Sequence, residues 1–307
     1  MTAERALDAG VTATRPEPRR RGRGRVWRRL LHQPASVAAG VILAVLFVIG
    51  AIFPKVSHTD PQRVNLSPHW INHPPLLSGW HILGTDQVGR DVLVRSLYGL
   101  HTSEQSALLA TLIASVVGIV LGSIAGYRGG WVDTLIMRLA DMFGVLPAIM
   151  LLLIAYTYFY TVTVEEASLI IALYLWIPVA RVVRAEMSTL REREFVQAAL
   201  SLGASDRRIY FRHLLPNGMS TIIVATTTLL GQVIVLEATL EFFGIGVPSQ
   251  IQPTLGNLIG DAQIGSLTNG LGWWTLVTPA GLLVLILVSV NLLGDGLAEA
   301  LRPARPR

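Results

Sequence analysis

Few side chains in this sequence could carry out covalent or metal chemistry, and none falls into a known catalytic spacing. The chain of 307 residues has no cysteine, which removes disulfides, thiolate metal sites and a cysteine nucleophile. Its one lysine, Lys55, follows a proline and lies outside any G-x-x-x-x-G-K-[ST] phosphate-binding pattern. Neither H-E-x-x-H nor G-x-S-x-G occurs. The sequence therefore predicts no catalytic site and no ATP site in this chain.

A weaker arrangement joins a histidine to two carboxylates. His81, Asp86 and Asp91 could be imagined as a metal site. No second histidine supports such a site, and capping of a following helix accounts for the two aspartates. We therefore expect no metal site here.

The most informative segment is 194–216, a charged stretch between two hydrophobic runs that one glycine divides. Phe195, Ala198, Ala199 and Leu202 recur at helical spacing, which predicts a short helix with a narrow apolar face that needs a partner. Gly203 then breaks the helix. We call residues 194–216 the elbow.

A second short helix is expected after the glycine. Ser205 is placed to cap it, and Asp206 falls in its first turn. Arg212 and His213 come near its end, as the helix dipole favours. From these features alone, an amphipathic loop on the membrane surface is an equally good interpretation.

The spacing within the elbow adds a family resemblance. The Q-A-A sequence at 197–199, Gly203 after three intervening residues, and Leu215-Pro216 resemble the "EAA" loop of membrane-spanning subunits of bacterial ATP-binding-cassette importers. The resemblance implies that the elbow docks into a cleft on a separate ATPase subunit. Gln197 replaces the usual glutamate of the motif, keeping hydrogen-bonding capacity but losing the charge. The residues implied in this coupling loop, 191–215, and at its border are Arg193, Glu194, Phe195, Gln197, Ala198, Ala199, Leu202, Gly203, Ser205, Arg208 and Pro216.

Three further signatures extend the resemblance over about residues 35 to 302. The pattern H-x-L-G-T-D-x-x-G-R-D at 81–91 is similar to that of dipeptide and oligopeptide permeases. The turn A-G-Y-x-G-G matches 125–130, and the segment 237–246 resembles E-A-x-L-S-F-L-G-L-G with Glu241 and Phe243 substituted. Within 81–97 we expect a helix that starts at Thr85 and Asp86 and lies on the outer membrane interface.

Composition and hydrophobic runs indicate the elements that position these motifs. Hydrophobic residues make up 51% of the chain and charged residues 15%, with a formal net charge of +5 and a mean hydropathy of +0.52, which is typical of a membrane protein. The run 168–180, of 13 residues, is short for a crossing. The expected spans are Ala35–Phe53, Ala107–Gly126, Met142–Tyr160, Ser168–Ala180, Ser220–Leu236 and Trp273–Leu293.

The distribution of arginine favours six crossings. With six, the Arg-rich start of the chain, the segment Arg181–Arg212 and the C-terminal arginines Arg302, Arg305 and Arg307 share one face, as the positive-inside rule requires of the cytoplasmic side. The same distribution accounts for the basic charge without nucleic acid. We thus expect a multi-pass protein of the bacterial cytoplasmic (inner) membrane with both termini in the cytoplasm.

The predicted fold is an all-α polytopic membrane protein with six transmembrane helices, which the resemblance identifies as the transmembrane domain of a type I ABC importer. The expected divisions are a cytoplasmic Arg-rich tail at 1–34, the first transmembrane helix at 35–54, an extracytoplasmic segment with an interfacial helix at 55–102, the core with its coupling loop at 103–295, and a cytoplasmic tail at 296–307.

Three charged residues near the spans are candidates for the pathway or for gating. Arg138 and Asp141 are three positions apart, which predicts an ion pair at the inner end of the third span. Glu237, at the outer end of the fifth span, could face a translocation path or could meet headgroups and loop amides. Pro147, Pro178 and Pro279 should kink the spans that contain them.

The resemblance also implies the partners and the task. They are a homologous second permease, two ABC ATPase subunits that bind ATP and Mg, and an extracytoplasmic solute-binding protein. Membrane lipids surround the subunit, and the cargo is dipeptides or oligopeptides, with nickel or glutathione carried by related permeases. A passive channel and an intramembrane hydrolase, with Ser123 or Ser168 and His213, are the alternatives.

Overall fold

A computed structural model describes residues 28–75, 81–145, 147–158, 162–269 and 272–301. The described residues are mainly helical, and an isolated β-bridge joins Thr85 and Asp91. The all-α class is confirmed. The helices are α2 (Pro34–Val56), α3 (Val92–Arg128), α4 (Gly130–Val145), α5 (Ala148–Thr157), α6 (Val164–Arg191), α7 (Glu194–Ser201), α8 (Asp206–Ile209), the π-helical turn η1 (Tyr210–Leu214), α9 (Leu215–Phe242), α10 (Leu255–Asn269) and α11 (Trp273–Leu301).

The described residues include five helices that are long and apolar enough to cross a membrane, and the bent pair α4 and α5 would make a sixth span. Most of the Arg-rich tail and the arginines at 302–307 lie outside the described residues. The short run 168–180 is the middle of the 28-residue helix α6, so the charged residues around it extend the helix instead of ending it. Pro178 and Pro279 lie within α6 and α11.

The expected interfacial helix is wrong in two respects: it starts later than predicted, and it is not separate from the next membrane-spanning helix. The helix starts at Val92, where Asp91 is the N-cap and accepts a hydrogen bond from the backbone N–H of Val94. It then continues as α3 for 37 residues, so the expected division at 102/103 falls inside one helix. Residues 85–91 form turns because the carboxylate of Asp86 accepts hydrogen bonds from backbone N–H groups of its own loop.

The third hydrophobic run is not one straight helix. α4 and α5 meet at an angle of 87°. Pro147 is the N-cap of α5, and a proline cannot continue a preceding helix because it has no backbone N–H to donate. The proline in this run was visible in the sequence, but it breaks the run instead of kinking it.

Glycines allow α3 and α6 to pack at close range. Gly118, Gly122 and Gly126 recur every four residues on the face of α3 that meets α6. A methyl group at Gly118 would lie 2.8 Å from the carbonyl oxygen of Trp176, and one at Gly122 would run into the carbonyl oxygen of Ala180. Small residues at this spacing are typical of membrane helices whose backbones approach each other.

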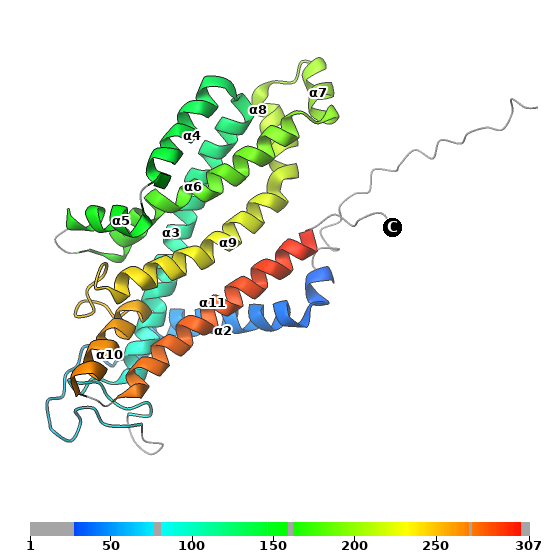
Figure 1. Ribbon diagram of the computed structural model, residues 1–307. Helices are drawn as coiled ribbons and strands as arrows, with labels where there is room; N and C mark the ends of the chain where they lie inside the picture. The colour runs from blue at the N-terminus through cyan, green and yellow to red at the C-terminus, as the bar shows by residue number, and fades with distance from the viewer. Residues whose placement is uncertain (1–27, 76–80, 146, 159–161, 270–271, 302–307) are drawn as a thin grey trace, which may run out of the picture.

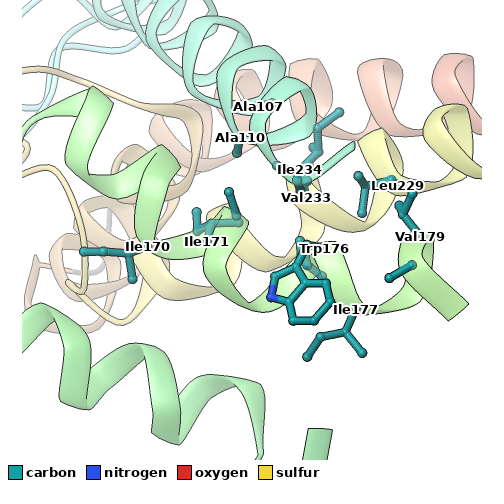
Figure 2. Packing of buried hydrophobic residues seen from close by; sticks show 14 of the residues in the cluster. Ala107, Ala110, Ile170, Ile171, Trp176, Ile177, Val179, Leu229, Val233 and Ile234 are labelled. Carbon is teal, nitrogen blue, oxygen red and sulfur yellow. The ribbon is translucent and has the colours of Figure 1, made fainter. Parts of the chain in front are cut away.

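The core lies where α3, α6 and α9 meet. Figure 2 shows Trp176 and Val179 of α6 facing Leu229 and Val233 of α9, with Ala107 of α3 behind them. All these side chains are buried. α9 therefore packs against two other helices over its middle turns.

The elbow and the outer segment occupy opposite ends of the bundle. In Figure 1, α7 and α8 lie at one end, and α10 lies with the loops of residues 57–75 and 81–91 at the other. The start of α2 packs against the end of α11, where the hydroxyl of Ser36 donates to the carbonyl of Leu292 over 3.2 Å. Leu301 shares a groove with Arg193 and Phe195 of the elbow end, so α2 begins and α11 ends toward the elbow.

Candidate functional site

The first helix of the elbow, α7, is fixed by a buried side chain, by the partly buried Ala199, which packs against the core, and by a hydrogen bond. Val196 is fully buried. The side-chain amide of Gln197 donates to the backbone carbonyl of Arg191 at the end of α6, over 3.1 Å. The sequence did not predict that Val196 is buried, because the apolar face was assigned to Phe195, Ala198 and Leu202.

The turn after α7 is a Schellman motif centred on Gly203. The N–H of Gly203 bonds to the carbonyl of Leu200, and the N–H of Ala204 bonds to the carbonyl of Ala199. Gly203 has a φ of +75°, which glycine adopts without steric cost. The predicted glycine turn is confirmed.

The second helix begins where the sequence predicted but does not end there. Ser205 occupies the N-cap position of α8, although its side chain makes no capping hydrogen bond. α8 runs through the π-helical turn η1 into α9, so Arg212 and His213 lie in a continuous helix and not at its end. Pro216 falls in the first turn of α9, as expected.

Two tyrosines attach this second helix to α3. The hydroxyl of Tyr127 donates to the carboxylate of Asp206 over 2.6 Å. The hydroxyl of Tyr210 donates to the hydroxyl of Ser123 over 3.0 Å. Ile209, which lies between Asp206 and Tyr210 in the sequence, is fully buried. The elbow is therefore held against α3 and α6 and is not a loose surface loop.

The remaining surface of the elbow is exposed and partly apolar. Leu202 is 87% exposed and Phe195 is 40% exposed, and Ala198 is also exposed. Phe195, Leu200 and Leu202 are three large apolar side chains exposed within eight residues, and exposed apolar groups that cluster are typical of an interaction site. Arg193, Arg207 and Arg208 add positive charge around it. This arrangement provides a surface on which a partner can dock.

Ion pairs hold the outer signature together. Asp86 accepts from Arg90 over 2.7 Å and from the 2% exposed Arg95 over 2.8 Å. His81 pairs with Asp91 over 2.7 Å, so this histidine and both aspartates already have partners within the chain. Trp274 of α11 donates its indole N–H to the carbonyl of Thr85 over 3.0 Å. These contacts fold residues 81–91 into a compact unit, which we call the outer cap. Among the described residues, no group of three or more His, Asp or Glu could hold a metal.

The predicted pair of Arg138 and Asp141 is wrong. Asp141 instead pairs with Arg181 of α6 over 2.9 Å, and Arg184 pairs with Asp133. Because α4 packs beside α6, the two arginines of α6 lie closer to these aspartates than Arg138 does on α4 itself. Arg138 has no ion-pair partner among the described residues.

Glu237 lies inside the bundle and not on an open surface. It is 4% exposed, and it lines a small internal cavity with Glu104 of α3. Glu241, one turn later, is also 4% exposed and lies against Gly256 of α10. A headgroup contact is therefore wrong for Glu237, and its part in gating stays a prediction.

Neither serine of the hydrolase alternative meets His213 in the described part of the chain. Ser123 accepts from Tyr210, and Ser168 bonds to Ser106 and to the carbonyl of Val164. The ring of His213 lies beside Phe195, with 6.5 Å between the ring centroids. The described residues thus lack the nucleophile–base pair that this alternative needs.

The described residues contain five membrane-length helices, six if α4 and α5 count as one span, and an exposed elbow held against them, which defines a polytopic membrane protein. Comparison with known proteins gives the particular family. The family "binding-protein-dependent transport system inner membrane component" matches residues 118–305, and the N-terminal transmembrane domain of oligopeptide transport permease C matches residues 23–75. The chain belongs to the family of binding-protein-dependent transport system inner membrane components. It is a multi-pass inner-membrane protein, and such permeases work with ATPase and substrate-binding partners.

Several relatives are similar over most of their length. The dipeptide transport system permease protein DppC of Bacillus subtilis is 33% identical over 90% of this chain and 84% of its own. The oligopeptide transport system permease protein OppC of the same organism is 34% identical over 86% and 84%. The glutathione transport system permease protein GsiD of Pectobacterium atrosepticum is 31% identical over 90% and 89%.

A solved structure supports the fold. A chain of the MetNI methionine ABC transporter, in an inward-facing conformation, aligns with a TM-score of 0.53 and 21% identity. It covers 69% of this chain and 97% of its own. The predicted transmembrane domain of an ABC importer is confirmed as the fold.

Proposed function

We propose that this chain is one of two membrane-spanning permease subunits of an ATP-driven importer of dipeptides and oligopeptides. The observation that supports this proposal most strongly is the elbow. It is fixed against the helix bundle and exposes Leu202, which is 87% exposed, and Ala198 to a partner. The relatives named as dipeptide and oligopeptide permeases support the peptide cargo. GsiD, named for glutathione, supports a short peptide-like cargo as the alternative, and nickel is the other alternative within this family.

The elbow would receive the work of ATP hydrolysis. Two ABC ATPase subunits bind ATP and Mg, and this chain supplies no ATP site of its own. Residues 206–242 form one helical path from the elbow through α9, so a displacement of the docked elbow passes directly into a core helix. Preferential binding of the elbow to one ATPase state converts that state into an inward or outward opening of the bundle.

The assembly requires a homologous second permease, which completes the translocation pathway, and an extracytoplasmic solute-binding protein. We place the elbow and both termini in the cytoplasm. The arginines of the elbow and the N-terminal tail support this orientation, as does the position of the start of α2 and the end of α11 toward the elbow. The loops 57–75 and 81–91 and the helix α10 then face the binding protein.

Uptake of a labelled tripeptide into proteoliposomes tests the proposal. The reconstituted complex of both permeases, both ATPases and the binding protein should accumulate the peptide only with ATP. Accumulation that needs neither ATP nor the ATPase subunits would contradict the proposal and favour a passive channel. Uptake of nickel or glutathione in preference to peptides would keep the transport class and replace the cargo.

A further inference from the structure

A groove of about 890 Å³ runs between α6, α9 and the end of α11, on the elbow side of the bundle. In Figure 1, α9 lies between α6 and α11. Arg193 and Phe195, at the base of the elbow, also line the groove. A movement of the elbow would therefore change the groove's shape. Its volume falls within the usual range for small-molecule sites, about 300–1,000 Å³.

One face of α9 presents uncharged hydrogen-bonding side chains to this groove. Asn217, Thr221, Thr228 and Gln232 line it, and their spacing places them within an arc of about 60° over a length of about 22 Å. Hydrocarbon offers such groups no hydrogen bonds. A row of them along one face of a membrane-spanning helix therefore indicates that this face does not lie against lipid tails.

The hydrogen-bonding capacity of this face is partly unused. The hydroxyl of Thr228 donates to the carbonyl of Val224 over 3.0 Å, and the amide of Asn217 donates to the carbonyl of His213 over 2.6 Å. Both side chains keep oxygen lone pairs that can accept from an N–H group. Gln232 is exposed and makes no hydrogen bond to the described residues, so it can both donate and accept.

We propose that this face of α9 carries the peptide by hydrogen bonding to its backbone amides. The inference rests on the proposed function and names the substrate-contacting side chains. Backbone N–H and C=O groups are common to all peptides, so neutral donors and acceptors bind them whatever the side chains are. The lining contains one acidic and one basic side chain, Glu186 and Arg193, and their opposite charges leave it without a bias against acidic or basic peptides.

A closely packed second permease is the competing occupant. Membrane helices that pack closely use small residues at the contact and can also hydrogen-bond through Ser, Thr, Asn and Gln side chains. The groove leaves about 890 Å³ of open space along this row, which fits a passing hydrogen-bonding solute better than a closely packed helix.

The absence of cysteine from the sequence allows a clean test. Single cysteines replace Thr228 or Gln232 in the complete importer, and a water-soluble maleimide measures their accessibility. Thr227→Cys is the matched control, because the neighbouring Thr227 packs toward Gly294 of α11 outside the groove. We expect Thr228→Cys and Gln232→Cys to react at least about tenfold faster than Thr227→Cys. We expect tri-alanine-loaded binding protein, trapped with ATP and vanadate, to slow them.

Thr228→Val supplies a second measurement that does not depend on labelling. Valine keeps the shape of threonine and removes the hydroxyl, so we expect the KM for tri-alanine to rise at least about threefold while Thr227→Val leaves it unchanged. Equal effects of both valines, unreactive groove cysteines in every state, or their constitutive cross-linking to the second permease would overturn the inference. ATP-driven uptake by the cysteine-free parent is measured in the same vesicles. If the parent shows no ATP-driven uptake, the proposed function is contradicted together with the inference. If the parent shows uptake but one of the results above is found, only the inference is contradicted.

Discussion

The amide nitrogen of Gln197 lies 3.1 Å from the backbone carbonyl oxygen of Arg191 and donates a hydrogen bond to it. This bond joins α7 to the end of α6, where helix carbonyls have no partner within their own helix. A glutamate, which the related motif has at this position, could not donate in its ionised form. The substitution therefore gives this chain an intramolecular bond in place of a charge.

Replacing Gln197 by glutamate or alanine should loosen α7. A net hydrogen bond contributes about 1 kcal/mol, so backbone amides of residues 194–198 should exchange with deuterium about fivefold faster in the detergent-solubilised subunit. Hydrogen exchange read by mass spectrometry measures this. Leu202→Ala, at an 87% exposed site on the same elbow, is the control. Unchanged exchange in both Gln197 variants would contradict the assigned bond.

Gly203 should tolerate asparagine but not valine. Its φ is +75°, and no atom lies within 4 Å of an added Cβ, so the cost of a side chain comes from the backbone alone. Left-handed backbone costs an ordinary residue about 1–2 kcal/mol, and asparagine adopts it more readily than a β-branched residue.

In the reconstituted importer, Gly203→Val should lower peptide uptake per ATP hydrolysed, and Gly203→Asn should stay near the parent value. The ratio of uptake to phosphate release measures the coupling. A parental ratio in the valine variant would show that the elbow does not need this turn.

Asp86 should be essential for the outer cap. It is the shared anionic partner of Arg90 and Arg95, and Arg95 is 2% exposed. Without Asp86, Arg95 keeps only the more distant carboxylate of Asp261, at 3.6 Å, and removing one partner of a buried pair costs up to about 3–5 kcal/mol. Asp86→Asn should therefore lower the midpoint of thermal unfolding in detergent markedly. Asp60→Asn, which changes an exposed carboxylate, should have little effect, and equal midpoints for the two variants would contradict the network.

The sequence predicted features whose signal is local. Gly203 and the start of the helix after Ser205 follow from backbone preferences of single residues, and both are confirmed. The hydrophobic runs also located the long helices, because apolar composition alone identifies them.

Features that depend on packing between distant segments were not predicted. Asp141 pairs with Arg181, which is 40 residues away in sequence, and only the packing of α6 beside α4 makes that pair. Val196 was overlooked because the face of α7 that is buried depends on where α6 and α8 lie. The glycine repeat at 118, 122 and 126 was a visible signal for close helix packing that the sequence analysis did not use.

The central claim is that the exposed face of α7 binds ATPase subunits. Ala198→Arg places a long charged side chain on that face, opposite the buried Val196. Ser67→Arg adds the same side chain at an exposed position of the outer segment, at the other end of the bundle. The buried contacts of the elbow are left intact in both variants.

The most direct measurement is affinity purification of the solubilised subunit from cells that express the whole importer, with ATPase activity assayed in the eluate. The parent and Ser67→Arg should retain the ATPase subunits, and Ala198→Arg should lose at least about nine-tenths of the co-purified activity, since burying an unpaired charge costs several kcal/mol. Equal recovery of ATPase activity from all three chains, or none from the parent, would contradict the account and leave the elbow a surface loop.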